Sequence, residues 1–164
     1  EKPHDYVGAL KLLPIRLLRM YVNAYQSYLW NKTVALYLQK KSKIMKKISY
    51  SEGELVFVSD PEKFKDLKIP LIGFGQEELG NREMRDIVDE LMKEENLSYS
   101  DFIIKQIPEL TLEGELRKVV VPIQNLKIGK KSKDELNSEK QKVKISFFLP
   151  KGSYATMAVK RIVS

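Results

Sequence analysis

One segment of the sequence, residues 13–38 (LPIRLLRMYVNAYQSYLWNKTVALYL), constrains the fold more than any other. Its apolar side chains recur at spacings of three, four and seven residues, which is the repeat of an amphipathic α-helix. Pro14 suits the first turn of a helix, where its missing N–H costs nothing, and the next Gly or Pro is Gly53. The segment therefore predicts one long helix from Pro14 to about Lys41.

The polar side chains of this helix follow one line along it. At roughly 100° per residue they occupy about a third of its circumference. The stripe consists of Arg16, Arg19, Asn23, Gln26 and Ser27. We expect this stripe to be exposed and the apolar remainder to be buried. Tyr25, Tyr28 and Trp30 lie beside the stripe, and two roles fit them: stacking on nucleobases, or core packing, which we favour for Tyr28 and Trp30.

The rest of the chain mixes strand and helix signals. Runs rich in β-branched and aromatic residues predict strands at 54–59, 116–123 and 143–149. Capping residues predict further helices at 81–95 after Asn81, at 102–106 after Ser98, and from Ser153 to Val163. An irregular lead-in is expected at 1–10 and a polar loop at 127–140. The predicted class is α+β: a long N-terminal helix and further helices packed on a small mixed or antiparallel sheet, ending in a strand–turn–helix.

Charge is distributed unevenly along the chain. The formal net charge is +7, from 29 lysines and arginines against 22 aspartates and glutamates. Basic residues gather at 39–51 and 127–144, whereas 77–95 is acidic. This distribution suits oriented binding of a polyanion such as a nucleic acid. A lysine-rich and glutamate-rich surface that only solvates the protein explains the same composition.

Several kinds of chemistry lack the residues that they need. The absence of cysteine excludes disulfides and thiolate zinc sites and is typical of a reducing compartment, so we expect a cytoplasmic protein. A single histidine, His4, cannot build a histidine-rich metal site, and no Gly-x-Ser-x-Gly surrounds a serine nucleophile. No Gly-Lys-Ser/Thr follows Gly73 and Gly75, so they form no phosphate loop. Charged residues interrupt 13–38, which therefore does not span a membrane.

RNA binding has better support from the residues. Aromatic side chains next to arginine or lysine suit looped or single-stranded RNA, where bases stack and phosphates form ion pairs. Arg16 and Arg19 fit such a role or a contact between domains, and they equally fit a solvated helix face. Near the C-terminus, Lys151 precedes the predicted start of the last helix, whose free N–H groups attract anions. Tyr154 stands in the first turn of that helix.

Four stretches carry a family resemblance: DYVGAL at 5–10, LP at 13–14, YVNAYQSYLWN at 21–31 and FLPKGSYAT at 148–156. Gly114-x-x-Arg117 between them is a weaker feature. In this order and at these intervals they resemble the archaeal branch of the TruD family of tRNA pseudouridine synthases. The resemblance spans nearly the whole chain, although 40–113 contributes little to it.

This resemblance implies isomerisation of a tRNA uridine, at position thirteen in this family, to pseudouridine without any cofactor. The family's essential group is an aspartate in the N-terminal half. Neither its motif nor the Asn-x-Phe-Gly-like motif that follows it occurs here, so no aspartate of this chain is assigned as catalytic. We expect a C-terminal piece that is inactive alone. Its partners would be tRNA and the N-terminal catalytic half of the same protein.

The resemblance also implies site residues and domains. Tyr154 matches the aromatic position that lines the family's active site. The residues expected to bind RNA are Arg16, Arg19, Gln26, Lys151 and Lys160. Lys160 and Arg161 stand where the family usually has Arg and Glu, which departs from its pattern. Residues 1–140 would form the family's inserted domain, and 141–164 the strand and helix that return to the catalytic domain. The alternative is a noncatalytic RNA-binding or interaction module.

Overall fold

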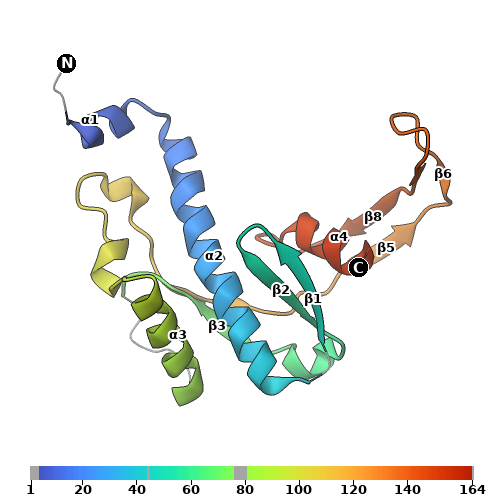
Figure 1. Ribbon diagram of the computed structural model, residues 1–164, viewed down its shortest axis with the longest axis horizontal. Helices are drawn as coiled ribbons and strands as arrows, with labels where there is room; N and C mark the ends of the chain where they lie inside the picture. Colours follow the sequence, from blue (N-terminus) through green and yellow to red (C-terminus); the bar gives the residue numbers. More distant parts are fainter. Residues whose placement is uncertain (1–3, 44, 76–80, 164) are drawn as a thin grey trace. The chain divides into compact units, whose positions relative to one another are not determined.

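A computed structural model gives the structure of the protein and describes residues 4–43, 45–75 and 81–163 (Figure 1). It contains two compact units, Glu1–Val119 and Val120–Ser164. Helices and small antiparallel sheets build the chain, so the predicted α+β class is confirmed. The predicted boundary at 140/141 concerns the family's domains and stays a prediction, whereas the compact units divide after Val119.

The first unit is built around α2 (Ile15–Lys41), which confirms the predicted long helix. Pro14 precedes its first turn. At its other end the Ser42 N–H donates to the Leu38 carbonyl oxygen (2.9 Å), while Ser42 itself is extended and ends the helix. Basic residues in the last turn suit the negative end of the helix dipole.

Shorter elements surround α2 in this unit. Helices and 3-10 turns are α1 (Tyr6–Lys11), η1 (Pro61–Phe64), α3 (Arg82–Glu94), η2 (Tyr99–Phe102) and η3 (Pro108–Leu110). Strands are β1 (Met45–Tyr50), β2 (Gly53–Val58), β3 (Lys68–Leu71) and β4 (Glu115–Lys118). β1 pairs with β2 and β3 with β4, both antiparallel, with Ile48 opposite Leu55 and Ile69 opposite Arg117.

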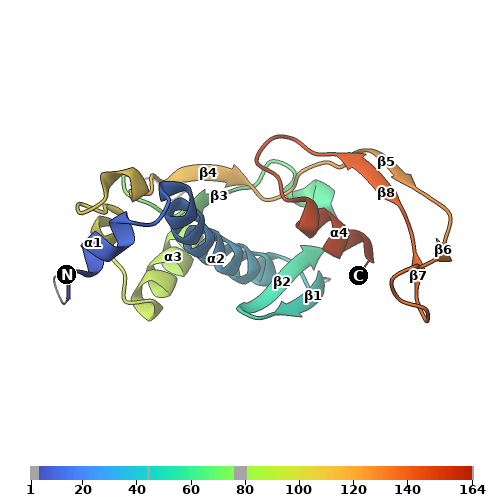
Figure 2. The same cartoon turned by 90° about the horizontal axis from the view of Figure 1, so that it is seen from above.

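α3 lies alongside α2, as both views show (Figures 1 and 2). Asn81 caps α3 by accepting the Met84 N–H at 2.9 Å, which confirms the predicted cap. The apolar face of α3 packs against the second half of α2 in two buried clusters. The first contains Leu29, Ile72, Val88, Leu91, Met92 and Phe102. The second contains Val34, Tyr37, Leu38, Val58, Ile69, Met84 and Ile87.

The first half of α2 is more exposed than the sequence predicts. Its Leu18 packs with Ile107 and Leu110 in a small third cluster. Other large apolar side chains are open to solvent, with Met20 55% and Tyr21 59% exposed. The expectation that the apolar side of the helix is buried is therefore wrong for this half. The helical repeat determines which side chains share a face, but not whether another element covers that face.

Two predictions about helices also need correction. The lead-in at 1–10 contains α1, whose Gly8 N–H is capped by the Asp5 carboxylate at 2.8 Å. The short helix predicted at 102–106 is absent from the described residues there, and η2 precedes it instead. Ser98 and Asp101 form the capping box of η2, so the cap is correct and the element is shorter.

The strand predictions are partly correct. The segment predicted at 54–59 overlaps β2, and the segment predicted at 143–149 contains β8. The strand predicted at 116–123 is β4, which begins at Glu115 and ends at Lys118. β1 lies within the basic stretch 39–51 and was not predicted. Adjacent lysines in β1 hide the alternation of apolar and polar residues that marks a half-buried strand.

The second unit is a hairpin followed by a helix. Its elements are β5 (Gln124–Ile128), β6 (Ser132–Lys133), β7 (Gln141–Lys142), β8 (Ile145–Phe148) and α4 (Ala155–Val163). β5 pairs with β8, and β6 with β7, both antiparallel. The polar loop predicted at 127–140 is therefore correct at 134–140, which forms the turn, and wrong at 127–128 and 132–133, which belong to paired strands. Asn125, at φ 51°, lies where the register of β5 shifts.

Candidate nucleic-acid interface

Arg16 and Arg19 are exposed near the start of α2. Arg16 lies in the first turn, which contains no acidic residue. A cation is electrostatically unfavourable there, because the unpaired N–H groups at this end of a helix carry partial positive charge. Arg16 therefore does not stabilise the helix through its dipole. Together with the helix end, it forms a local positive charge that suits an anion.

An open groove of about 410 Å³ lies beside Arg19. The Arg19 Nε donates to the Glu109 carbonyl oxygen at 3.2 Å, which fixes the arginine against η3. Apolar side chains line the groove: Leu13, Ile15, Leu18, Ile107 and Pro108. Lys11 adds a second basic residue that the sequence analysis missed. The available signal was Asp5, whose cap marks the start of α1, the helix that contains Lys11 in its last turn.

Gln26 does not belong to the exposed stripe. The side chain is 5% exposed, and its amide donates to the carbonyl oxygens of Ile72 (2.9 Å) and Glu113 (3.2 Å). These bonds attach α2 to the segments after β3 and before β4. The prediction that Gln26 binds RNA is corrected accordingly, because its donor groups are used inside the protein.

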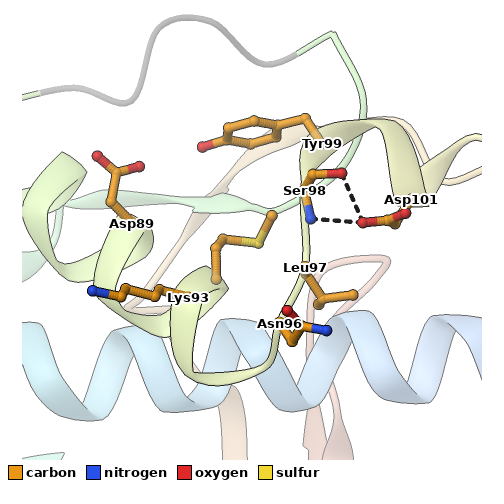
Figure 3. A pocket seen from close by; sticks show the side chains of 8 residues that line it. Asp89, Lys93, Asn96, Leu97, Ser98, Tyr99 and Asp101 are labelled. Atoms are coloured by element: carbon orange, nitrogen blue, oxygen red, sulfur yellow. Dashed lines mark hydrogen bonds between the residues drawn. The ribbon is translucent and has the colours of Figure 1, made fainter.

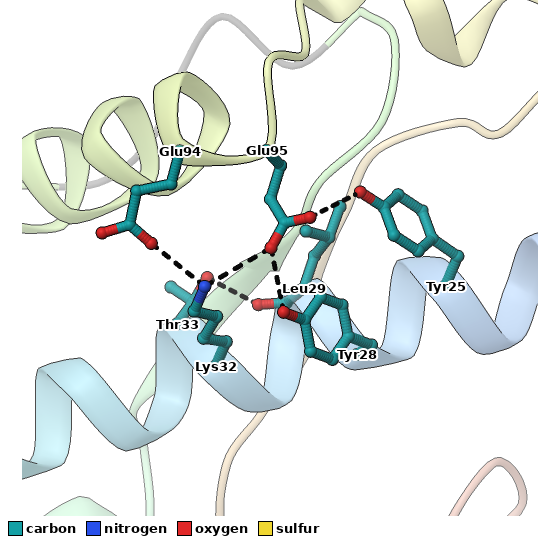
Figure 4. Close-up of polar contacts among 7 residues, drawn as sticks. All are labelled: Tyr25, Tyr28, Leu29, Lys32, Thr33, Glu94 and Glu95. Atoms are coloured by element: carbon teal, nitrogen blue, oxygen red, sulfur yellow. Dashed lines mark hydrogen bonds and ion pairs between the residues drawn. The ribbon is translucent and has the colours of Figure 1, made fainter. Parts of the chain in front are cut away.

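Tyr25 and Tyr28 meet the end of α3 in a polar cluster (Figure 4). The Glu95 carboxylate accepts the Tyr25 hydroxyl at 3.0 Å and the Tyr28 hydroxyl at 2.9 Å. Lys32 Nζ lies 3.0 Å from Glu94 Oε2 and 3.4 Å from Glu95 Oε1. The two tyrosine rings stack on each other, with their centroids 5.9 Å apart. The cluster therefore joins α2 to α3.

These contacts shift the ionisation of the cluster. Burial raises the pKa of Glu95, but hydrogen bonds from Tyr28, Tyr25 and Lys32 outweigh burial and leave that pKa below its ordinary value. Burial and the hydrogen bond to Glu95 raise the pKa of Tyr25 to about 12. The tyrosine hydroxyls thus stay protonated beside a carboxylate, which repels phosphate. The geometry favours a structural role over base stacking for this pair.

Trp30 packs in the core, as we favour from the sequence. Its ring is half-buried against the second cluster. The indole Nε1 donates to the Ile69 carbonyl oxygen at 3.2 Å. The guanidinium carbon of Arg117 lies 5.3 Å from the ring centroid, within cation–π range. Arg117 of the Gly114-x-x-Arg117 feature therefore has a structural role in the first unit.

A second hollow, of about 620 Å³, lies at the end of α3 (Figure 3). Asp101 accepts hydrogen bonds from the Ser98 N–H and the Ser98 hydroxyl, both at 2.7 Å. The Tyr99 hydroxyl is buried and has no hydrogen-bond partner among the described residues. Burial, followed by the charge of Asp89, raises the pKa of Tyr99. Two carboxylates and one lysine, Lys93, line this hollow, which is unsuited to RNA phosphates.

The turn before α4 contains two predicted site residues. Lys151 is exposed, and Tyr154 is 55% exposed. Gly152 between them has φ 86°, in the left-handed region that glycine adopts without strain. The Ala158 N–H donates to the Tyr154 carbonyl oxygen at 3.3 Å, so the helix begins after Tyr154. Ser153 is therefore not the helix cap, contrary to the prediction.

Lys160 lies on α4, away from this turn in sequence. It is half-buried, and Arg161 beside it is exposed. Both lie in the last turn of α4, where the helix dipole favours cations. Their placement thus has a structural explanation that needs no RNA.

The acidic segment, the helices and the potential metal ligands bear on functions other than RNA binding. Residues 77–80 of the acidic segment lie outside the described residues. Over the described ranges, no helix is long and apolar enough to cross a membrane. Within the same ranges, no group of three or more His, Cys, Asp or Glu side chains could hold a metal ion.

Comparisons with known proteins agree on one family. The model of the family described as tRNA pseudouridine synthase D (TruD) matches residues 1–162. The probable tRNA pseudouridine synthase D 2 of Methanocaldococcus jannaschii is 38% identical, over 98% of this chain and 39% of that protein. The probable tRNA pseudouridine synthase D 1 of Methanococcus maripaludis is 33% identical, over 97% of this chain and 42% of that protein.

A solved structure is similar as well. The crystal structure of a TruD protein from Methanosarcina mazei matches with a TM-score of 0.64 and 27% identity, over 97% of this chain and 41% of that one. The matches define the class of protein, a family of enzymes that modify tRNA. The chain belongs to the TruD family, as its motifs implied. It spans about two fifths of the length of the relatives it matches.

Proposed function

We propose that this chain is part of a tRNA pseudouridine synthase that converts the uridine at position thirteen of tRNA to pseudouridine. The family match over residues 1–162 carries the proposal. In this isomerisation the bond from C1′ to uracil N1 breaks, the base turns, and C1′ bonds to C5 while the C5 proton is released and N1 gains one. Atoms balance without a cofactor. The catalytic aspartate would belong to the longer protein, which would act in the cytoplasm.

In this proposal the chain supplies RNA binding and one wall of the active site. Tyr154 is half exposed at a turn, so its ring could lie against a uracil that has left its stack. Lys151, exposed beside it, would pair with a neighbouring phosphate. Lys160 is assigned to RNA by the family resemblance alone.

The start of α2 would provide a second RNA contact. Arg16 and Arg19 are exposed there beside the positive end of the helix, and Lys11 lines the same groove as Arg19. Positive charge at this place attracts phosphate oxygens whatever the base sequence. Gln26 has no part in this contact, since it is buried.

Release of tritium from tRNA labelled at C5 of uridine tests the proposal. A protein of the relatives' full length that contains this chain should release tritium, and tRNA with cytidine at position thirteen should release none from that site. The 164-residue chain alone should be inactive. Release by the chain alone would contradict the placement of the catalytic aspartate outside it. Binding of tRNA by the longer protein without any release would favour the noncatalytic module.

A further inference from the structure

The hairpin at 124–148 forms a ribbon of two strands whose residues are nearly all exposed. β5 and β8 pair at its base, and β6 and β7 pair near its tip (Figure 2). From 124 to 144 every residue is exposed except Asp134, which is half-buried. A two-stranded sheet is only marginally stable in water. The outer part of this ribbon buries little apolar surface, so core packing does not explain its sequence.

The tip of the ribbon is a defined turn. Asp134 Oδ1 accepts the Leu136 N–H at 2.9 Å, and Asp134 Oδ2 accepts the Asn137 side-chain amide at 2.8 Å. The Asp134 N–H donates to the Lys140 carbonyl oxygen at 3.1 Å, and the Lys140 N–H donates to the Asn137 carbonyl oxygen at 2.9 Å. These bonds hold the backbone of the turn in one conformation. They therefore also determine where the backbone of the lysines on both sides of the turn lies.

Lysine dominates the charge of the ribbon. Its lysines are Lys127, Lys130, Lys131, Lys133, Lys140, Lys142 and Lys144, and its acidic residues are Asp134, Glu135 and Glu139. Glu135 pairs with Lys142, and the turn uses the Asp134 carboxylate. No other lysine of the ribbon has an ion-pair partner among the residues that the structure describes. Most of the positive charge is therefore not neutralised by neighbouring side chains.

These lysines project from both faces of the ribbon. Residues directly opposite each other in an antiparallel pair point to the same face, and neighbours along a strand alternate. The register places Lys133 opposite Gln141 and Ser132 opposite Lys142. Lys133 and Lys142 therefore lie on opposite faces, and a single flat anionic surface could not contact both.

Lysines on an open strand also discourage edge-to-edge pairing with other chains. That explanation is weak at this tip. β6 and β7 contain two residues each, which is too short to form an extended edge. Lys130 and Lys131 precede β6 and lie outside any strand. Protection of an edge therefore does not account for the lysines around the turn.

We propose that the ribbon tip, residues 130–142, binds the sugar–phosphate backbone of the tRNA substrate. The inference rests on the proposed function, because it takes tRNA as the polyanion. Lysine contacts to phosphate position a protein on RNA without reading its sequence. The lysines that precede the turn, Lys130, Lys131 and Lys133, have no ion-pair partner among the described residues and are therefore available to phosphates.

Binding of unmodified tRNA at several salt concentrations, by a protein of the relatives' full length that contains this chain, tests this site. The variant Lys130→Gln/Lys131→Gln/Lys133→Gln should raise the Kd roughly tenfold and reduce the log–log salt slope by about 3, because three phosphates would each lose a lysine partner. The matched control Lys63→Gln/Lys65→Gln/Lys68→Gln removes the same charge from exposed positions around η1 and should leave the slope unchanged. Arginine at the three tip positions should restore binding.

A second variant tests the same site by a gain of affinity. Glu135→Gln removes the partner of Lys142, so this variant should bind tRNA more tightly than the wild type. If the wild type binds tRNA and the tip variant shows the same salt slope as the wild type, the ribbon site is overturned and the proposed function is not. A wild-type protein that binds no tRNA would overturn both the site and the RNA-binding part of the proposed function. Equal losses in the tip and control variants would show a nonspecific effect of charge and also overturn the site.

Discussion

The Gln26 side chain of α2 donates to the Ile72 carbonyl oxygen at 2.9 Å, at a place where the glutamine is almost completely buried. The same amide donates to the Glu113 carbonyl oxygen at 3.2 Å. One side chain thus satisfies two backbone acceptors from segments that flank β3 and β4. A buried acceptor without a donor costs free energy, because water no longer reaches it. Gln26 is therefore a structural residue.

Replacing Gln26 with alanine should lower the free energy of unfolding by about 1–3 kcal/mol, since buried carbonyl oxygens lose their donor. Urea denaturation followed by the fluorescence of Trp30 measures this change. The control Asn23→Ala, on an exposed position of the same helix, should stay within about 0.5 kcal/mol of the wild type. A loss of tRNA binding without any loss of stability would contradict the structural role.

Glu95 should make the free energy of unfolding depend on pH in the acidic range. Its pKa is lowered in the folded protein from the ordinary value of 4.5, because hydrogen bonds from Tyr28, Tyr25 and Lys32 outweigh burial. The stabilisation by the Glu95 carboxylate is therefore fully present above the pKa that Glu95 has in the unfolded chain. It is lost as the pH falls through the lower pKa that Glu95 has in the folded protein. Glu95→Gln should cost about 1–2 kcal/mol at pH 7 and flatten the decline in stability between neutral pH and acid.

Urea denaturation of both proteins across this pH range checks the prediction. The control is Glu90→Gln, an exposed glutamate one turn earlier in α3, which should keep the wild-type profile. Parallel profiles for the wild type and Glu95→Gln would show that the cluster does not couple protonation to folding.

Leu29 of α2 is fully buried against α3, so its truncation should leave a cavity. Leu29→Ala should cost about 2–5 kcal/mol of unfolding free energy, from lost burial and from the cavity. Met20→Ala, one of the exposed positions on the same helix, should change stability by less than about 0.5 kcal/mol. Similar losses in both variants would contradict the difference in burial between the two halves of α2.

The proposed role of Tyr154 predicts a loss that depends on the aromatic ring. In the longer protein, Tyr154→Ala should lower kcat/KM for tRNA by about 10-fold to 100-fold, since stacking on a base contributes about 1–3 kcal/mol. Tyr154→Phe keeps the ring and should remain close to the wild type. The salt slope of binding should be the same for all three proteins, because phosphate contacts are unchanged. An equal loss in the phenylalanine variant would assign the role to the hydroxyl.

Local signals in the sequence predict the elements that local interactions form. Pro14 and the apolar repeat give the extent of α2, and Asn81 gives the start of α3, because caps and repeats act within a few residues. The lysines of β1 conceal a strand whose partner, β2, supplies most of the buried side chains of that pair. Sequence alternation is weak there, so the pairing was not predictable.

The candidate site was harder to predict, because its contacts are distant in sequence. Gln26 shares a helix face with Arg16 and Arg19, and only its bond to Ile72, 46 residues away, distinguishes it from them. Tyr28 meets Glu95 at a separation of 67 residues. A helical repeat contains no information about such partners. For this reason the prediction of an exposed polar stripe is correct at Arg16 and Arg19, which are exposed, and wrong at Gln26, which is buried.

The exposed apolar side chains at the start of the first unit affect how unfolding can be followed. Tyr6 is 72% exposed and Leu12 86% exposed, and Met20 and Tyr21 of α2 are also open to solvent. Amphipathic dyes such as ANS fluoresce on apolar surface that is open to water. The native chain should therefore already be bright with such a dye, and a dye-based melting curve would begin from a high baseline. Trp30, the single tryptophan, packs in the core and gives a cleaner optical signal of unfolding.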